Sequence, residues 1–292
     1  MVIKVNTTRD DSLGKQLLSI KGFLSELNSN IENDLALDFS NFSYAPPLLA
    51  VFFGIVLEKY PHIQTRNISG SYLSYIKFPD GLKPDLIPDW EQNLQSYSRK
   101  SYLPLINFNT SPREAVTVER NNVISHACQI IKHITKVPVN YYTGISYLIS
   151  ELSDNIVDHS RCERGWLSFQ FYPSKGYIDF CIGDSGVGLL GAYQHYTGEQ
   201  DYSNITTHID AMDNVIKGIS TKNIQERGYG VHTSREMLIS GLKGQFILFS
   251  GNALLYNYNL VDFNCLFSGT IAVLRISGAK PDLNFNYNNY VE

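Results

Sequence analysis

The sequence predicts an α+β protein in which a smaller α/β unit precedes a larger α/β sandwich, whose mixed sheet is covered by helices. Apolar residues recur at intervals of three and four in several long stretches, as in amphipathic helices. Residues 165–172 and 177–183 instead alternate in polarity around a Pro-Ser-Lys-Gly turn, which is typical of a β-hairpin. The 292 residues are 43% hydrophobic and include 19 Tyr and 15 Phe, which is ample for buried cores.

The smaller unit covers residues 1–80. Its pattern predicts a helix at 13–28, a strand at 34–39, a helix at 48–60, a strand at 63–68 and a helical segment at 71–78. Pro46 and Pro47 precede the second helix, where proline is tolerated because an N–H at that point has no partner within the helix. Since this helix is apolar on all sides, we expect it to be buried against a sheet.

The larger unit covers residues 118–279 and follows a proline-bearing segment, 81–117, that we interpret as a linker. Besides the hairpin, its pattern predicts helices at 119–136, 142–159, 210–219 and 231–242, and strands at 245–250, 253–261 and 270–276. Residues 280–292 are rich in Asn and Tyr, and we expect them to form a loose tail.

Composition narrows the class of protein. A net charge of -4 argues against a nucleic-acid-binding protein. The four cysteines form no Cys-x-x-Cys pair, so they support neither a zinc knuckle nor a redox motif, and free thiols fit a reducing compartment. The first residues do not resemble a secretion signal, and the longest apolar run, 45–57, is too short to span a bilayer. We therefore expect a soluble, cytoplasmic protein without membrane contacts.

Four polar side chains share one face of the helix predicted at 142–159. Asn155 follows Glu151 by one turn, and Asp158 and His159 follow it by two turns. A carboxylate, an amide and an imidazole beside an apolar stripe can hold a hard cation and orient a water molecule. Taken alone, such a polar face is more often simply solvated.

A first glycine-bearing segment, Asp184-Ser-Gly-Val-Gly, directly follows the hairpin. Gly186 and Gly188 permit positive φ and close approach of the backbone to a flat ligand, and Asp184 can accept a hydrogen bond from an exocyclic amine. The segment weakly resembles a dinucleotide-binding fingerprint. That fingerprint begins a helix within a βαβ unit, whereas this segment follows a hairpin, so we reject the interpretation. The sequence contains no P-loop motif.

A second segment, Arg227-Gly-Tyr-Gly-Val, precedes a predicted helix. A helix N-terminus preceded by glycines exposes N–H groups that favour a phosphate. Lys222, Arg227 and Arg235 are near in sequence and can neutralise its charge. The three segments thus offer a cation-binding helix, an acceptor for an amine and a phosphate-binding helix start, which together describe a purine nucleoside triphosphate bound with Mg²⁺.

These segments resemble the sequence boxes of the GHKL superfamily (gyrase, Hsp90, histidine kinase and MutL), which binds ATP in the Bergerat fold. Residues 151–159 are similar to its N-box, 184–188 to its G1 box and 227–231 to its G2 box, while Ser268-Gly-Thr270 resembles its terminal Gly-Thr element. The similarity covers about residues 118–278.

The resemblance implies roles for individual residues. Asn155 would hold Mg²⁺ through its amide oxygen, Glu151 would polarise the attacking water, and Asp184 would accept the adenine amine. Residues 189–227 would form a lid over the ATP. The remaining nucleotide-binding positions would be Asp158, His159, Gly186, Gly188, Lys222, Arg227, Gly228, Tyr229, Gly230, Val231 and Thr270.

The smaller unit resembles a STAS-type domain, the fold of anti-sigma-factor antagonists, through the turn between residues 37 and 49. In those antagonists the helix opens with Asp-Ser-Ser-Gly, whose serine accepts a phosphate. Here the corresponding positions are Pro46, Pro47, Leu48 and Leu49, so the acceptor is missing and a docking or sensing role is implied. The alternative is an accessory α/β layer of one larger domain.

Among GHKL proteins, the combination of boxes and neighbouring unit most resembles serine/threonine kinases of the anti-sigma-factor type. Only a short tail follows Ile276, which disfavours the topoisomerase, Hsp90 and MutL types with their transducer domain. We expect a cytoplasmic regulatory protein that binds ATP and Mg²⁺ and either phosphorylates a protein partner or hydrolyses ATP slowly. An ATP-gated docking module without turnover stays open as the alternative. The oligomeric state stays open too, a homodimer included.

Overall fold

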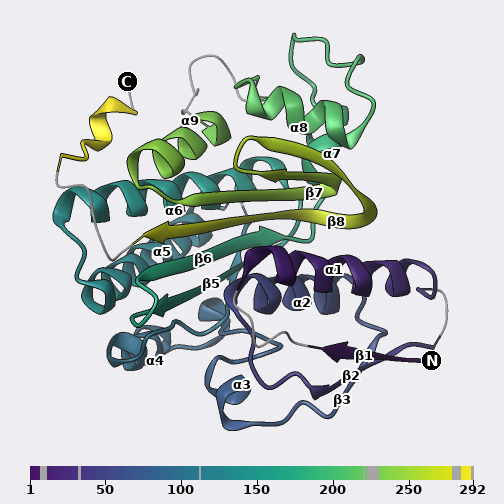
Figure 1. Ribbon diagram of the computed structural model, residues 1–292, viewed down its shortest axis with the longest axis vertical. Coiled ribbons are helices and arrows are strands. Elements are labelled where there is room, and N and C mark those ends of the chain that lie inside the picture. Colours follow the sequence, from purple (N-terminus) through teal and green to yellow (C-terminus); the bar gives the residue numbers. More distant parts are fainter. Residues whose placement is uncertain are drawn as a thin grey trace.

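The computed structural model describes residues 1–6, 12–31, 34–111, 113–219, 221, 230–277 and 284–290. Within these residues the chain is an α+β protein with two sheets and with helices both between and outside them (Figure 1). The α+β class predicted from the sequence is therefore confirmed.

The first sheet is parallel and has the order β1-β2-β3 in the described residues. Its strands alternate with the helices predicted from the periodicity. Their bounds are β1 (Val2–Asn6), α1 (Leu13–Asn28), β2 (Ala36–Asn41), α2 (Pro47–Lys59), β3 (Gln64–Arg66) and α3 (Ser71–Tyr75). Helix α1 coincides with the predicted range 13–28.

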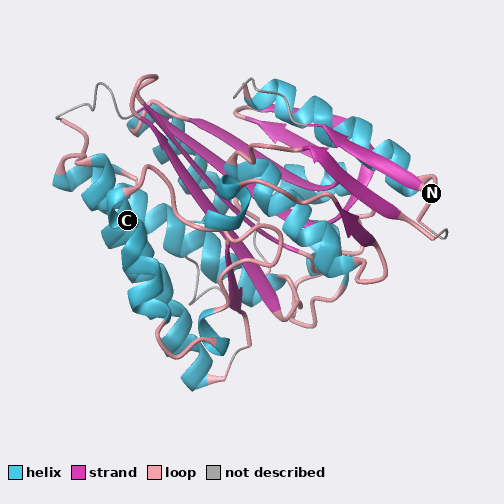
Figure 2. Ribbon diagram, turned by 90° about the horizontal axis from the view of Figure 1, so that it is seen from below, coloured by secondary structure: helices cyan, strands magenta, loops and turns pink. Residues whose placement is uncertain are grey.

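Helices α1 and α2 lie between the first sheet and the second (Figures 1 and 2). The all-round apolar character of α2 follows from this position, because the helix is buried from Pro47 to Val56. Gly54 faces strand β5 (Arg164–Tyr172) so closely that a Cβ there would lie 2.8 Å from the Trp166 ring. One continuous core, which includes Phe52 and Phe249, joins the first unit to this face of the second sheet.

The second sheet has the order β4-β5-β6-β8-β7 in the described residues, and each neighbouring pair is antiparallel. Its other strands are β4 (Ile106–Asn109), β6 (Tyr177–Asp184), β7 (Gln245–Tyr256) and β8 (Asn259–Ser277). The predicted mixed sheet is therefore wrong. β5–β6 and β7–β8 are hairpins, which require antiparallel neighbours, and β6 and β8 also meet in antiparallel register.

The helices of the second unit cover the opposite face of this sheet (Figure 2). They are α5 (Glu114–Thr135), α6 (Val139–His159), α7 (Gly188–Gln194), α8 (His208–Ile216) and α9 (Gly230–Glu236), the last continued by a π-helical turn at Met237–Gly241. Successive residues of the strands in the second sheet thus face two different helix layers, α1 and α2 on one side and the helices of the second unit on the other. The chain is accordingly built as sheet, helices, sheet and helices.

The segment 81–117, interpreted as a linker, contributes to the second unit. It contains α4 (Trp90–Gln95), short 3-10 turns at Pro84–Leu86 and Ser96–Arg99, and strand β4, which pairs with β5. Leu94, Ile106 and Phe108 from this segment are buried in the core below α5 and α6.

Two expectations about the C-terminal part need correction. The strands predicted at 245–250 and 253–261 are the continuous β7 and the start of β8, with the hairpin turn at residues 257–258. The tail expected to be loose instead packs on the protein in its described part, 284–290, because Phe285 is buried between Gly144 and Gly241. A 3-10 turn follows at Tyr287–Asn289. None of the helices in the described ranges combines the length and apolar character needed to cross a membrane.

Candidate functional site

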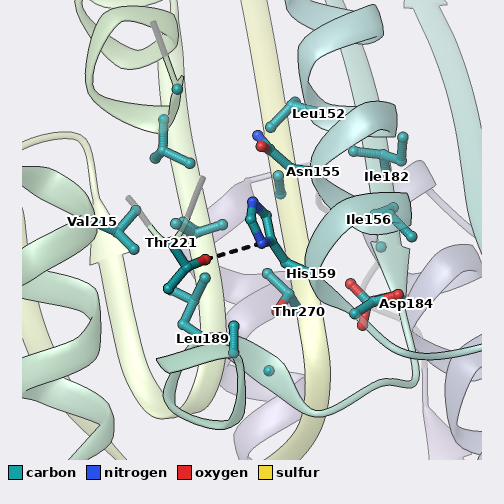
Figure 3. Close-up of a pocket in the computed structure, with 18 of the residues that line it drawn as sticks. Leu152, Asn155, Ile156, His159, Ile182, Asp184, Leu189, Val215, Thr221 and Thr270 are labelled. Carbon is teal, nitrogen blue, oxygen red and sulfur yellow. Dashed lines mark hydrogen bonds between the residues drawn. The ribbon is translucent and has the colours of Figure 1, made fainter. Parts of the chain in front are cut away.

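A cavity of about 160 Å³ opens between α6, the end of β6, the part of β8 around Thr270, and the helices α7 and α8 (Figure 3). Its walls are mostly apolar, and it is similar in volume to the engineered lysozyme cavity of about 150 Å³ that accepts benzene. Several of the residues predicted for a nucleotide site line it. The predicted residues that line it are Asn155, His159, Asp184, Gly188, Gly230, Val231 and Thr270.

Helix α6 presents Asn155 and His159 to the cavity because its apolar stripe, which includes Leu148 and Leu152, is fixed in the core. Residues four positions apart lie above one another on a helix, so the amide and the imidazole share one wall. The Asn155 Nδ2 atom is buried and has no hydrogen-bond partner in the described part of the chain. His159 Nδ1 lies 3.1 Å from the hydroxyl oxygen of Thr221, which also lines the cavity (Figure 3).

The other two polar residues of this helix lie elsewhere. Glu151 is half-buried one turn before Asn155, and Asp158 is exposed to solvent. Neither lines the cavity. The four side chains that share one face in the sequence pattern are thus divided between the cavity and its surroundings.

Asp184 ends β6 and is only 3% exposed. It lies opposite Thr270 in the β6–β8 register, and its Oδ1 accepts a hydrogen bond of 2.9 Å from the Gly186 N–H. The pKa of this carboxyl is raised to about 7, mainly by burial and in smaller part by the nearby Glu58 carboxylate, against hydrogen bonds from the backbones of Gly186 and Thr270 that lower it. A buried acceptor that titrates near neutral pH therefore lies at the base of the apolar cavity.

The two glycines after Asp184 have different surroundings. Gly188 has φ +69°, lines the cavity and begins α7. Gly186 does not line the cavity but packs on the carbonyl of Ser160, where a Cβ would lie 2.0 Å from the oxygen. Glycine is required at both positions, by conformation in one case and by close packing in the other.

A buried serine that the sequence pattern does not single out joins α7 to the sheet. Ser250 of β7 accepts a hydrogen bond of 3.0 Å from the Leu189 N–H and donates one of 3.0 Å to the Gly269 carbonyl. Its hydroxyl also lies 3.2 Å from that of Thr270. An isolated serine in an apolar strand carries no signal for this role.

Helices α7 and α8 form the second wall of the cavity, within the segment predicted as a lid (Figure 3). Leu189, Tyr193, Val215 and Ile219 contribute apolar surface there. The Tyr193 hydroxyl donates a hydrogen bond of 2.5 Å to the Ile219 carbonyl and so joins α7 to the chain just after α8. The described lid is therefore packed as a unit over the cavity.

The residues predicted to bind phosphate are only partly described. Gly230, with φ +57°, begins α9, and together with Val231 it lines the cavity. Lys222, Arg227, Gly228 and Tyr229 lie outside the described residues. The start of α9 therefore faces the same cavity as Asn155 and Asp184.

Protein ligands for a metal ion are few in the described part of the chain, which contains no group of three or more His, Cys, Asp or Glu side chains suited to one. The buried amide of Asn155, with its unpartnered Nδ2, is the polar group on the α6 wall that fits a contact with an ion. The oxygen and nitrogen of an amide exchange places by a simple flip, so either atom can face the cavity. Mg²⁺ commonly takes one or two protein ligands together with phosphate and water, which fits this arrangement.

No protein-family model matches the chain, and a comparison with curated protein sequences gives no match either.

Proposed function

We propose that the protein binds ATP with Mg²⁺ in this cavity, in the manner of the GHKL superfamily that its sequence boxes resemble. The observation that carries the proposal is the buried carboxylate of Asp184 at the base of an otherwise apolar cavity. A purine ring needs a flat apolar space, and the exocyclic amine of adenine needs an acceptor inside that space, because an unpartnered buried donor is costly. Asp184 supplies that acceptor.

Asn155 would hold the Mg²⁺ ion, and the start of α9 at Gly230 would lie near the phosphates. Bound Mg²⁺ supplies charge neutralisation between phosphate oxygens. His159, fixed by its contact with Thr221, adds a second polar group on the same wall. The proposed ligand thus extends from Asp184 along α6 toward α9.

Glu151 is the proposed general base, because it lies one turn before Asn155 on α6 and is half-buried. Its role would be to accept a proton from the attacking water or from a hydroxyl of a protein substrate. We propose a serine/threonine kinase of the anti-sigma-factor type or a slow ATPase, located in the cytoplasm and acting with a protein partner.

The fold details support the same proposal. The layer of α5 and α6 on one face of the second sheet and the lid of α7 and α8 are compatible with a Bergerat-type domain, whereas the antiparallel pairing differs from the mixed sheet expected for it. The parallel β1-β2-β3 sheet with α1 and α2 is compatible with a STAS-like unit. Pro46, Pro47, Leu48 and Leu49 are each buried, which favours a packing role for the helix start instead of a phosphorylated one.

An ATP-gated docking module without turnover is the second candidate. It is favoured by the position of Glu151, which does not line the cavity, and by the packed lid, which a nucleotide could hold in one arrangement. In this case ATP binding would change the surface formed by α7 and α8.

Calorimetric titration with Mg²⁺ and ATP, ADP or GTP, followed by product analysis after several hours, tests the proposal. We expect saturable, Mg²⁺-dependent binding of ATP that is lost in Asp184→Asn, because the amide presents a donor toward the amine. The variant Glu151→Ala separates binding from chemistry, since it should bind ATP but show no ADP release. Full affinity of Asp184→Asn would contradict the site, and binding without turnover in the unaltered protein would favour the docking module.

A further inference from the structure

A glutamate of the first unit contacts the loop that carries the proposed amine acceptor. Glu58 lies in the last turn of α2, and its Oε1 accepts a hydrogen bond of 2.7 Å from the Ser185 hydroxyl. Ser185 directly follows Asp184. The neighbouring Lys59 also reaches this residue, since its Nζ lies 3.5 Å from the Ser185 carbonyl oxygen. The end of α2 therefore contacts both the side chain and the backbone of Ser185.

The second oxygen of Glu58 is fixed by groups from the second sheet. Its Oε2 accepts hydrogen bonds from Trp166 Nε1 at 3.0 Å and from Asn107 Nδ2 at 3.3 Å. The Asn107 carbonyl accepts in turn from Arg164, which forms an ion pair with Asp85. Three donors thus bind one carboxylate, and hydrogen bonds to both of its oxygens fix the orientation of the Glu58 side chain.

The backbone of α2 is equally fixed at this point. Gly54 precedes Glu58 by one helical turn and so lies on the same face, and it is in close contact with the Trp166 ring. A helix pressed against β5 in this way cannot shift without opening the core that the two units share. The carboxylate is therefore a rigid support for Ser185.

We propose that Glu58 is a positioning residue for amine recognition, so that the nucleotide site is completed by the first unit through the Glu58–Ser185 hydrogen bond. This inference rests on the proposed function. Through Ser185, Glu58 holds Asp184 where its carboxylate meets the exocyclic amine of a purine.

The sharpest test compares ATP with inosine triphosphate, which carries an oxygen in place of the amine. Affinities of the full chain for both nucleotides with Mg²⁺ are measured at pH 8.5. Asp184 is ionised at this pH, so removing the charge of Glu58, which contributes to the raised pKa of Asp184, does not change the protonation of Asp184. In Glu58→Gln the amide oxygen stays with the Trp166 and Asn107 donors, so the NH2 group faces Ser185, whose hydroxyl must accept instead of donate, and a neutral hydrogen bond replaces the stronger one to a carboxylate. We expect ATP binding to weaken about fivefold, while inosine triphosphate binding is unchanged.

Two further variants separate positioning from other effects. Ser185→Ala should weaken ATP binding at least as much, and the double variant should bind no more weakly than Ser185→Ala alone, because both substitutions act on the same hydrogen bond. Glu163→Gln removes a carboxylate that lines the same groove as Glu58 and Ser185 but has no hydrogen bond to Ser185 in the described structure, and should leave both affinities unchanged. Thermal unfolding confirms that each variant is folded.

The outcomes distinguish the two proposals. Equal ATP affinity of the unaltered protein and Glu58→Gln would overturn the positioning role alone. Equal weakening of both nucleotides, or additive effects of Glu58→Gln and Ser185→Ala, would also overturn it, because general loosening would explain them. Failure of the unaltered protein to bind either nucleotide would overturn the proposed function, and the positioning role with it.

Discussion

The carboxyl group of Asp184 is buried yet titrates in the neutral range, and this combination has consequences for both binding and stability. Its pKa is raised to about 7 mainly because burial disfavours the charged form. At pH 8 the group is mostly ionised and is a strong acceptor, whereas at pH 6 it is mostly protonated. The proposed recognition of an amine therefore depends on pH through this residue.

We expect the affinity for ATP to fall about tenfold between pH 8 and pH 6, because the ionised fraction of a group with this pKa falls by about that factor. Inosine triphosphate is the control, since a protonated carboxyl can donate to its oxygen and its binding should not fall in parallel. Calorimetric titrations at several pH values measure both. If the affinities for the two nucleotides fell in parallel, the pH dependence would have to arise at the phosphates and not at Asp184.

Asp184→Asn should stabilise the protein at high pH, although we expect it to abolish the proposed binding of ATP. The folded-state pKa lies above the unfolded value of 3.8, so the contribution of this carboxyl to stability is present at low pH and is lost as the pH rises through about 7. The free energy of unfolding of Asp184→Asn, relative to that of the unaltered protein, should therefore be about 2 kcal/mol higher at pH 8.5 than at pH 5.5. Urea unfolding at both pH values measures this difference, with Glu163→Gln as the control. A difference that is zero or reversed would mean that Asp184 is not a neutral acid below pH 7.

At the scale of single elements, the long periodic segments were predictable and the short ones were not. The range of α1 and the β5–β6 hairpin follow from local apolar patterns that need no knowledge of distant residues. Strand β4 is only four residues long, and it is a strand because it pairs with β5, far along the chain. The antiparallel order β6-β8-β7 likewise depends on pairing that periodicity cannot reveal.

The same distinction applies to the site. Asn155, Asp184 and Thr270 belong to local motifs, and the fold brings them to one cavity. Ser250 and Glu58 act through contacts with residues remote in sequence, so no motif contains them. Their importance becomes visible only when the sheet and α2 are in place.

The packing of the C-terminal segment, residues 284–290, was not predicted from the sequence, and its contribution to stability can be measured. The Phe285 ring packs edge-on against Tyr141, with 5.3 Å between ring centroids, and fills the space left by Gly144 and Gly241. We expect Phe285→Ala to lower the free energy of unfolding by about 3 kcal/mol, as for other buried aromatic residues. Urea unfolding measures the loss, and Leu266→Ala, at an exposed leucine, is the control. A loss below about 0.5 kcal/mol would show that the segment is not docked in solution.

At the scale of the whole molecule, the sheet β4-β5-β6-β8-β7 has two buried faces. One faces α5 and α6, and the other faces α1 and α2. The first unit is therefore a structural layer of the second, because Trp166, Phe249 and Val273 would be exposed without it. This arrangement favours joint unfolding of the two units over independent domains.

We expect the full chain to unfold in urea in a single transition, with coincident curves from far-UV circular dichroism and tryptophan fluorescence. Trp90 and Trp166 both lie beyond residue 80, so fluorescence reports on the second part of the chain. Phe52→Ala in α2 should nevertheless shift both curves equally, by about 3 kcal/mol, because Phe52 packs on Phe267 of β8 with ring centroids 5.7 Å apart. Leu18→Ala, at an exposed position of α1, should shift neither. Two separate transitions, or a Phe52→Ala effect confined to the dichroism curve, would mean that the units fold independently. Joint unfolding would instead mean that α2, which carries Glu58, stays packed on the sheet that carries Asp184 for as long as the chain is folded.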